Sequence, residues 1–131
     1  MNRRVSGYLR KLVAERAEFI GEYCHFPDAF SFFPFQIDHI IGITHGGETK
    51  LENLAYTCLF CNAHKGTNIA TILLPNQEFV GLFNPRTEIW NEHFEIREGL
   101  IIGKTIVSNA TVKVLQLNKP ERVQERKELG I

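Results

Sequence analysis

The sequence lacks several features that would mark a specialised class of protein. It has no net charge, because 15 basic residues balance 15 acidic ones. No apolar run approaches the roughly 18 to 20 residues that cross a bilayer. The three cysteines are an odd number, which suits a reducing compartment or a metal better than a disulfide framework. The sequence therefore predicts no membrane span and lacks the basic surplus that usually accompanies nucleic-acid binding.

The composition nevertheless favours a folded globular chain. The 131 residues fit one domain, and a hydrophobic share of 44% with ten phenylalanines is enough to build a core. The start, MNRRVSGYLRKLV, lacks the uninterrupted apolar stretch of a secretory signal, so we expect a soluble cytoplasmic protein. Basic and acidic residues interleave over 119–128, which predicts a solvated, ion-paired helix face.

The first half of the chain predicts a helix, a strand and a second helix. Apolar residues recur at helical spacing over 6–20, with a serine at the start as N-cap, and 35–43 is typical of a strand or hairpin arm. The adjacent Gly46 and Gly47 require a loop, because glycine adopts turn conformations without steric cost. The segment CLFCNAHKG predicts a cysteine knuckle that runs into a helix ending at Gly66.

The second half predicts strands followed by helices. Residues 76–107 favour β-rich segments, and residues 108–129 favour two helices separated near Asn118. Trp90 and Phe94 are four positions apart, and we expect this aromatic pair to pack in a core.

The segment IDHIIGITHGGETKLENL places two polar residues, Asp38 and His39, in an apolar run where they need partners. Alone, the pair could be hydrogen-bonded and close a turn at the end of a strand. It is followed, however, by Asn53 and then by C-x-x-C-N-x-x-K-G, from Cys58 to Gly66. The combination is far more specific than the pair.

On these motifs, residues 16–68 resemble the HNH family of endonucleases. The later segments LFNPRTEIWNEHF and LQLNKPERV resemble the C-terminal extension of a bacterial HNH subgroup. The resemblance implies an α+β fold with a ββα-metal (His-Me finger) core at about 16–68 and an N-terminal helix. A β-rich and helical extension would follow at about 76–131, and we expect a single HNH domain over 1–131.

The resemblance also implies a role for each residue of the motif. Asp38 and Asn62 would hold one divalent ion, Mg²⁺ or Mn²⁺, because such hard ions prefer oxygen ligands. His39 would be the general base that activates water, and Asn53 would tie down the loop that keeps His39 in place. The implied activity is metal-dependent hydrolysis of phosphodiester bonds in DNA.

Three further residues are candidate nucleic-acid contacts, namely His64, Lys65 and Arg86. For His64 the alternative is simple exposure on the helix. Cleavage of both strands by a module with one active site would need two copies or two visits, so a homodimer is compatible with the prediction.

The cysteines leave two alternatives open. Many HNH proteins hold a structural zinc with two C-x-x-C knuckles, but here only Cys58 and Cys61 form a complete pair, and Gly21 stands where the second pair with Cys24 needs a cysteine. The chain either binds zinc through three thiolates, with His25 as the nearest fourth candidate, or has lost it.

We favour loss of zinc, because closed structural sites use four ligands. The cysteines would then pack as small apolar residues. Neighbouring aromatic side chains would provide the burial that zinc no longer provides, and these are Phe26, Phe30, Phe32, Phe33 and Phe35.

Two other functions compete with cleavage. A non-cleaving HNH-like module that docks on nucleic acid or protein would account for the neutral charge and the missing cysteine. A purely structural zinc ribbon would leave Asp38 and His39 unexplained. We favour the enzyme, because a module freed from catalysis has no chemical need to keep Asp38, His39, Asn53 and Asn62 together.

Overall fold

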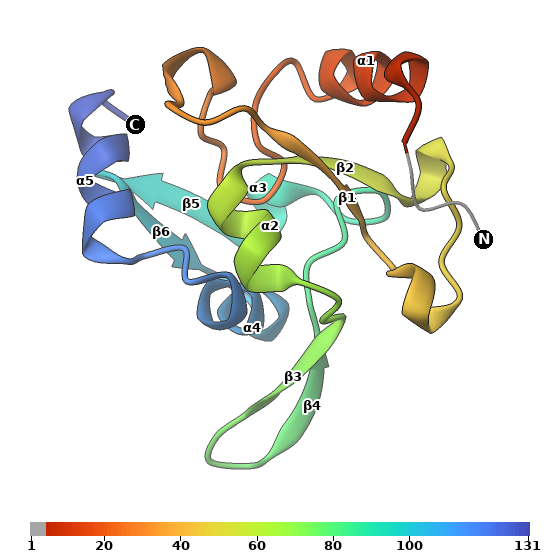
Figure 1. Cartoon of the computed structure of the whole chain (residues 1–131). Helices are drawn as coiled ribbons and strands as arrows, with labels where there is room; N and C mark the ends of the chain where they lie inside the picture. Colours follow the sequence, from red (N-terminus) through yellow and green to blue (C-terminus); the bar gives the residue numbers. More distant parts are fainter. Residues whose placement is uncertain (1–4) are drawn as a thin grey trace. The chain divides into compact units, whose positions relative to one another are not determined.

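The computed structural model describes residues 5–131. Residues 1–4 lie outside the described part, and with them the start of the segment in which we expect no secretory signal. That part is an α+β chain with five α-helices and three two-stranded antiparallel sheets (Figure 1). None of its helices is long and apolar enough to cross a membrane. The chain forms two compact units, one up to Thr67 and the other Asn68–Ile131. That the whole chain acts as one domain stays a prediction.

The first unit begins with α1, Gly7–Arg16, as the apolar spacing predicts. The Ser6 hydroxyl caps this helix by accepting a hydrogen bond from the Leu9 N–H at 3.2 Å. The helix ends earlier than expected, because Glu18 and Phe19 both adopt positive φ angles that a helix cannot continue through. It buries Val13 completely.

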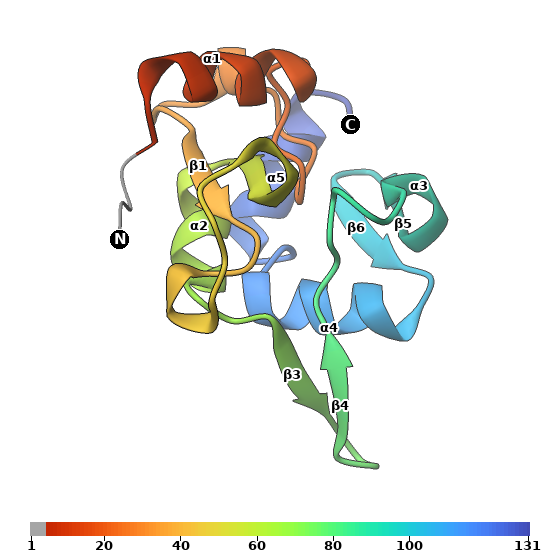
Figure 2. The same ribbon diagram turned by 90° about the vertical axis from the view of Figure 1, so that its right-hand side faces the viewer.

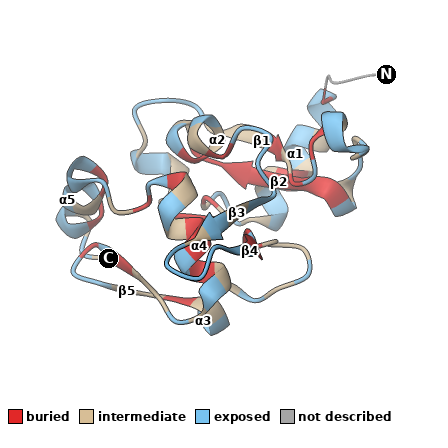
Figure 3. Ribbon diagram, turned by 90° about the horizontal axis from the view of Figure 1, so that it is seen from below, coloured by how far each residue is buried: buried red, intermediate tan, exposed pale blue. Residues whose placement is uncertain are grey.

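A pair of antiparallel strands forms the centre of this unit. β1, Gln36–His39, pairs with β2, Leu54–Thr57, so that Asp38 lies opposite Ala55 and His39 opposite Leu54. β2 is buried along its whole length (Figure 3). The core cluster beneath α1 consists of Val5, Val13, Leu54 and Tyr56, with Leu9, Ala14, Ala17, Phe35, Ile37 and Leu51 packed against it.

The long connection between β1 and β2 turns where the paired glycines predict. Gly46 has a φ of +88°, and a side chain on Gly47 would place its Cβ 1.7 Å from the Ile41 carbonyl oxygen. After β2 the chain enters α2, Leu59–Lys65, and the expected stop at Gly66 is confirmed by its φ of +52°.

The second unit consists of two hairpins and three helices. Its elements are β3 Ala70–Leu73, β4 Glu78–Gly81, α3 Trp90–His93, β5 Phe94–Arg97, β6 Leu100–Gly103, α4 Ile106–Leu115 and α5 Pro120–Glu128. The β3–β4 hairpin starts beside α4 and extends away from it (Figure 2). The break between the two last helices is confirmed.

Two expectations for this unit need correction. Residues 90–93 are a helical turn rather than a strand, and α4 starts at Ile106, inside the expected β-rich segment. It starts there because Thr105 and Ser108 form a capping box, in which each side chain accepts from the other's backbone N–H. The predicted aromatic pair exists: the Trp90 ring stacks on Phe94 at 5.0 Å between centroids, and Phe94 is buried.

The charged face expected on α5 is also wrong in part. Arg122 and Arg126 are buried, not solvated. The Arg122 guanidinium donates to the Leu115 carbonyl at 2.8 Å, and that of Arg126 donates to the Gly99 and Leu117 carbonyls, each at 2.6 Å. These arginines satisfy backbone carbonyls at the ends of other elements, a role that helical spacing alone does not reveal.

Leu54→Ala should lower the free energy of unfolding by about 2–5 kcal/mol, because the deleted side chain is fully buried in the first unit. Urea titration followed by circular dichroism measures the change. The matched control is Tyr8→Ala on the exposed face of α1, which should stay within about 0.5 kcal/mol of the parent. Equal effects of the two changes would contradict the assigned core.

Candidate functional site

An open pocket in the first unit brings together three of the residues singled out in the sequence. It has a volume of about 200 Å³, and its lining includes Asp38, His39 and Asn62. β1 supplies the first two residues and α2 the third. Two oxygen-bearing side chains and an imidazole thus face one solvent-accessible space.

The Asp38 carboxylate is buried but has strong partners. The Lys65 ammonium lies 3.1 Å from Oδ2, and the Tyr23 hydroxyl donates to the same oxygen at 3.1 Å. Burial raises the pKa of Asp38, whereas the Lys65 charge and both hydrogen bonds lower it. Burial also raises the pKa of Tyr23 well above its ordinary value, so its hydroxyl remains a donor.

His39 is half-buried beside Asp38, and its ring is held by a hydroxyl. Nε2 lies 2.9 Å from Oγ1 of Thr49, a residue of the loop between β1 and β2. Burial lowers the pKa of His39 from its ordinary value; Asp38 opposes that shift and Lys65 adds to it. The neutral imidazole, the form that can accept a proton, is therefore favoured at neutral pH.

The Asn53 side chain closes the loop that carries Thr49. Its amide nitrogen donates to the carbonyls of Ile41 and Glu48, each at 2.9 Å, and its oxygen accepts from the Ile41 N–H at 2.9 Å. Asn53 is buried, so these bonds replace water for three backbone groups. These hydrogen bonds are those expected of a side chain that tethers the loop between β1 and β2.

Asn62 presents its amide oxygen as the atom that can bind a cation. Its amide nitrogen donates to Gln36 Oε1, a contact between α2 and β1. The nitrogen is thereby oriented towards the strand. With the Asp38 carboxylate, this oxygen makes a donor set that fits a hard divalent ion, whose remaining positions would be filled by water and a phosphate oxygen.

The expected phosphate contacts fall in different environments. Lys65 is 2% exposed, and its ammonium pairs with Asp38, so it is not presented to solvent as a phosphate contact would be; its contact with a nucleic-acid backbone stays a prediction. His64 is half-buried on α2. Arg86 lies in the second unit, where its N–H donates to Asn84 Oδ1 at 2.9 Å. The roles of His64 and Arg86 stay predictions.

Tyr23, Gln36 and Thr49 touch the site without carrying a sequence signal of their own. Each reaches a motif residue from a segment whose local pattern is that of an ordinary turn or strand. Thr49 becomes recognisable only when loop closure places it next to His39, ten residues away. No spacing rule connects such partners.

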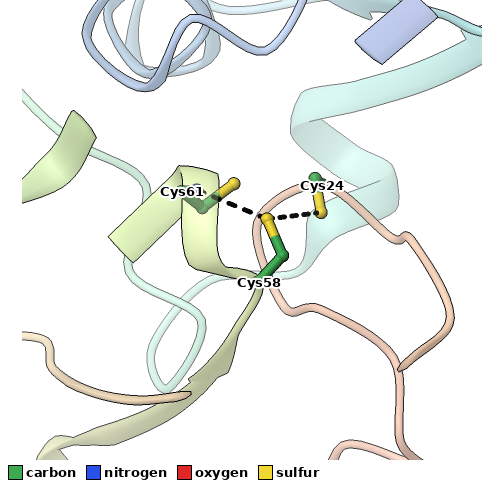
Figure 4. Close-up of side chains that lie close together, drawn as sticks. All are labelled: Cys24, Cys58 and Cys61. Atoms are coloured by element: carbon green, nitrogen blue, oxygen red, sulfur yellow. Dashed lines mark hydrogen bonds between the residues drawn. The ribbon is translucent and has the colours of Figure 1, made fainter. Parts of the chain in front are cut away.

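The three cysteines form a second cluster in the same unit (Figure 4). Their sulfur atoms all lie within 4.8 Å of one another, and Cys24 and Cys58 are 3.7 Å apart. Sulfurs on a zinc tetrahedron are separated by about 3.8 Å, given a bond length of about 2.3 Å. Burial raises the pKa of Cys61 well above its ordinary value, so an incoming ion would have to displace a proton.

Gly21 stands beside this cluster. A Cβ added to it would lie 3.0 Å from the Cys24 sulfur. Among the described residues, the group that could hold a metal contains the three sulfurs and no nitrogen of His25. Burial lowers the pKa of the His25 ring to about 4.

The aromatic compensation expected for a lost zinc is not present at most of the positions. Phe30, Phe32 and Phe33 are 65%, 93% and 44% exposed, so they bury little apolar surface around the sulfurs. The sulfur geometry is compatible with a thiophilic ion held by three thiolates, so both alternatives for zinc remain. Three thiolates are one ligand short of the four that a closed structural zinc site uses.

Comparison with known proteins agrees with the motifs. Residues 22–68 match the family model described as HNH endonuclease. The match covers both the pocket residues and the cysteine cluster. No curated protein and no solved structure matches the chain.

Gly21→Cys should convert the cluster into a four-thiolate site and tighten Zn²⁺ binding on the order of tenfold or more, because a fourth thiolate replaces water or an exogenous ligand. Competition against a chromophoric chelator measures the affinity. Gly21→Ser is the matched control, since it adds a side chain of similar size without sulfur. Equal affinities for the two variants would show that position 21 does not reach the ion.

Proposed function

We propose that this protein, whose residues 22–68 belong to the HNH endonuclease family, is a divalent-metal-dependent endonuclease that hydrolyses phosphodiester bonds in DNA. The supporting observation is the convergence of Asp38, His39 and Asn62 on one open pocket. In this proposal β1, β2 and α2 are the ββα-metal unit, and the pocket between β1 and α2 is the active site.

Asp38 and Asn62 would hold the ion, Mg²⁺ or Mn²⁺, through one carboxylate and one amide oxygen. When bound there, such an ion neutralises charge on the scissile phosphate and on the departing 3′ oxygen. Tyr23 and Gln36 would orient these two ligands, since each is hydrogen-bonded to one of them.

His39 would take a proton from the attacking water. A ring whose Nε2–H donates to Thr49 Oγ1 carries its lone pair on Nδ1, the nitrogen that can accept that proton. Thr49 is thus a positioning residue, and Asn53 keeps the Thr49 loop closed. The lowered pKa of His39 keeps the base neutral under ordinary conditions.

His39→Ala should abolish Mg²⁺- or Mn²⁺-dependent nicking of supercoiled plasmid, with a rate loss on the order of 10² to 10⁴. The loss is expected because no other group would accept the proton. His45→Ala is the matched histidine control: it removes an exposed loop ring and should leave nicking intact. Circular dichroism checks that both variants fold.

Two outcomes would contradict the mechanism. Unchanged cutting by His39→Ala would remove His39 from the reaction. DNA binding by the parent protein without nicking, across a range of divalent metals, would instead identify a non-cleaving HNH-like module.

Thr49→Val should reduce the single-turnover nicking rate about tenfold, because one neutral hydrogen bond to the base is lost. The change conserves shape, so DNA affinity should stay constant. Thr49→Ser restores the hydroxyl and should restore the rate, which separates orientation of His39 from packing. A Thr49→Val protein as fast as the parent would exclude this role.

A further inference from the structure

Lys65 lies buried next to Asp38, one of the residues that line the pocket. Its side chain extends from the last turn of α2 and is 2% exposed. The ammonium lies 3.1 Å from Oδ2 and 3.4 Å from Oδ1 of Asp38. It is therefore paired with the carboxylate that the proposed function assigns to the metal.

Backbone contacts hold this ammonium in place. It also donates to the carbonyl oxygens of Ile40 at 3.0 Å and His39 at 3.3 Å. A buried lysine with these acceptors would lose all of them on moving outward, where water alone would replace them. Lys65 is therefore held in place beside Asp38 rather than extending as a mobile surface arm.

The pairing leaves the pocket without net charge. Among the described residues that line it, Asp38 is the single carboxylate, and Asn62 is neutral. Lys65 cancels the one negative charge from behind. A divalent ion that enters the free protein meets two oxygen ligands, no surplus of negative charge, and an ammonium already attached to one ligand.

We propose that Lys65 is the built-in counter-ion of Asp38 and sets a low metal affinity in the free protein, so that the divalent ion is retained only when a nucleic-acid phosphate adds its own negative charge. This rests on the proposed function, in which Asp38 and Asn62 hold the ion. Magnesium sites of this kind use few carboxylates and share the ion with substrate phosphates.

The proposal and a merely structural role for Lys65 predict opposite changes in metal affinity when the Lys65 charge is removed. If Lys65 only kept Asp38 in position, removing its charge would disorder a ligand and weaken metal binding. If Lys65 competes with the ion for Asp38, removing the charge strengthens metal binding, because like charges a few ångströms apart repel. The direction of the change therefore decides between the two roles.

The experiment measures Mn²⁺ binding by the loss of the free-ion paramagnetic resonance signal, in the His39→Ala protein so that DNA stays uncut. Lys65→Gln in that background should bind Mn²⁺ about tenfold more tightly than its parent without DNA. Lys11→Gln, at an exposed position of α1, is the matched control for loss of one positive charge and should leave the affinity unchanged.

A short DNA duplex supplies the second arm. The parent should bind Mn²⁺ more tightly in its presence, by a factor of about 5 to 150, after correction for Mn²⁺ bound by the duplex alone. Mn²⁺ affinity without DNA that is unchanged or weakened in Lys65→Gln overturns the proposal. That result leaves plasmid nicking, and thus the proposed function, standing. Absence of Mn²⁺ binding in every protein, with and without DNA, overturns both.

If the Lys65→Gln protein does not fold, a second measurement still tests the proposal. The Lys65 ammonium signal is followed by nitrogen-15 NMR in the folded His39→Ala protein. It should stay unmoved in dilute Mg²⁺ alone and shift when the same Mg²⁺ is added with the duplex. A shift of equal size without DNA would overturn the proposal.

Discussion

The three hydrogen bonds of the Asn53 side chain are the constraint on which the candidate site depends. β1 and β2 pair over only four residues each, and the connection between them has no sheet partners of its own. One buried amide satisfies backbone groups at Ile41 and Glu48, at both sides of the glycine turn. Since Thr49 follows directly after Glu48, closing the loop also delivers the hydroxyl that holds His39. Asn53 therefore supports both the fold of the loop and the position of the candidate general base.

The ion pair between Asp38 and Lys65 adds a second constraint, this time between strand and helix. A buried pair seldom stabilises a fold more than apolar packing would, and breaking one side of it leaves an uncompensated charge. The pair is explained better by what it organises: the end of β1, the carboxylate facing the pocket and the last turn of α2 are fixed relative to one another. A chain selected for stability alone would have no need of it.

Sequence could predict those features whose cause is local. The cap of α1, the glycine turn, the stop at Gly66 and the short spacing from Cys58 to Asn62 each follow from chemistry within a few residues. Lys65 and Arg126 could not be placed, because a charged residue at helical spacing has the same pattern whether it meets water or a carbonyl from a distant element. Thr49 and Tyr23 were equally invisible, since their partners become neighbours only after folding. The exposure of Phe32 shows the converse, an apolar residue that the fold does not bury.

The neutral composition and the buried lysine and arginine side chains both affect how the protein can attract DNA. Nucleic-acid affinity without sequence preference comes mainly from lysine and arginine side chains at phosphates. Here Lys65, Arg122 and Arg126 are directed at acceptors inside their own units, so they add little to an attractive surface. For a nuclease of the proposed kind, an ion that bridges protein and phosphate would add to the attraction to DNA. A pocket wall that is neutral before the ion arrives fits such a protein, because the metal and the phosphate each supply the charge that the other needs.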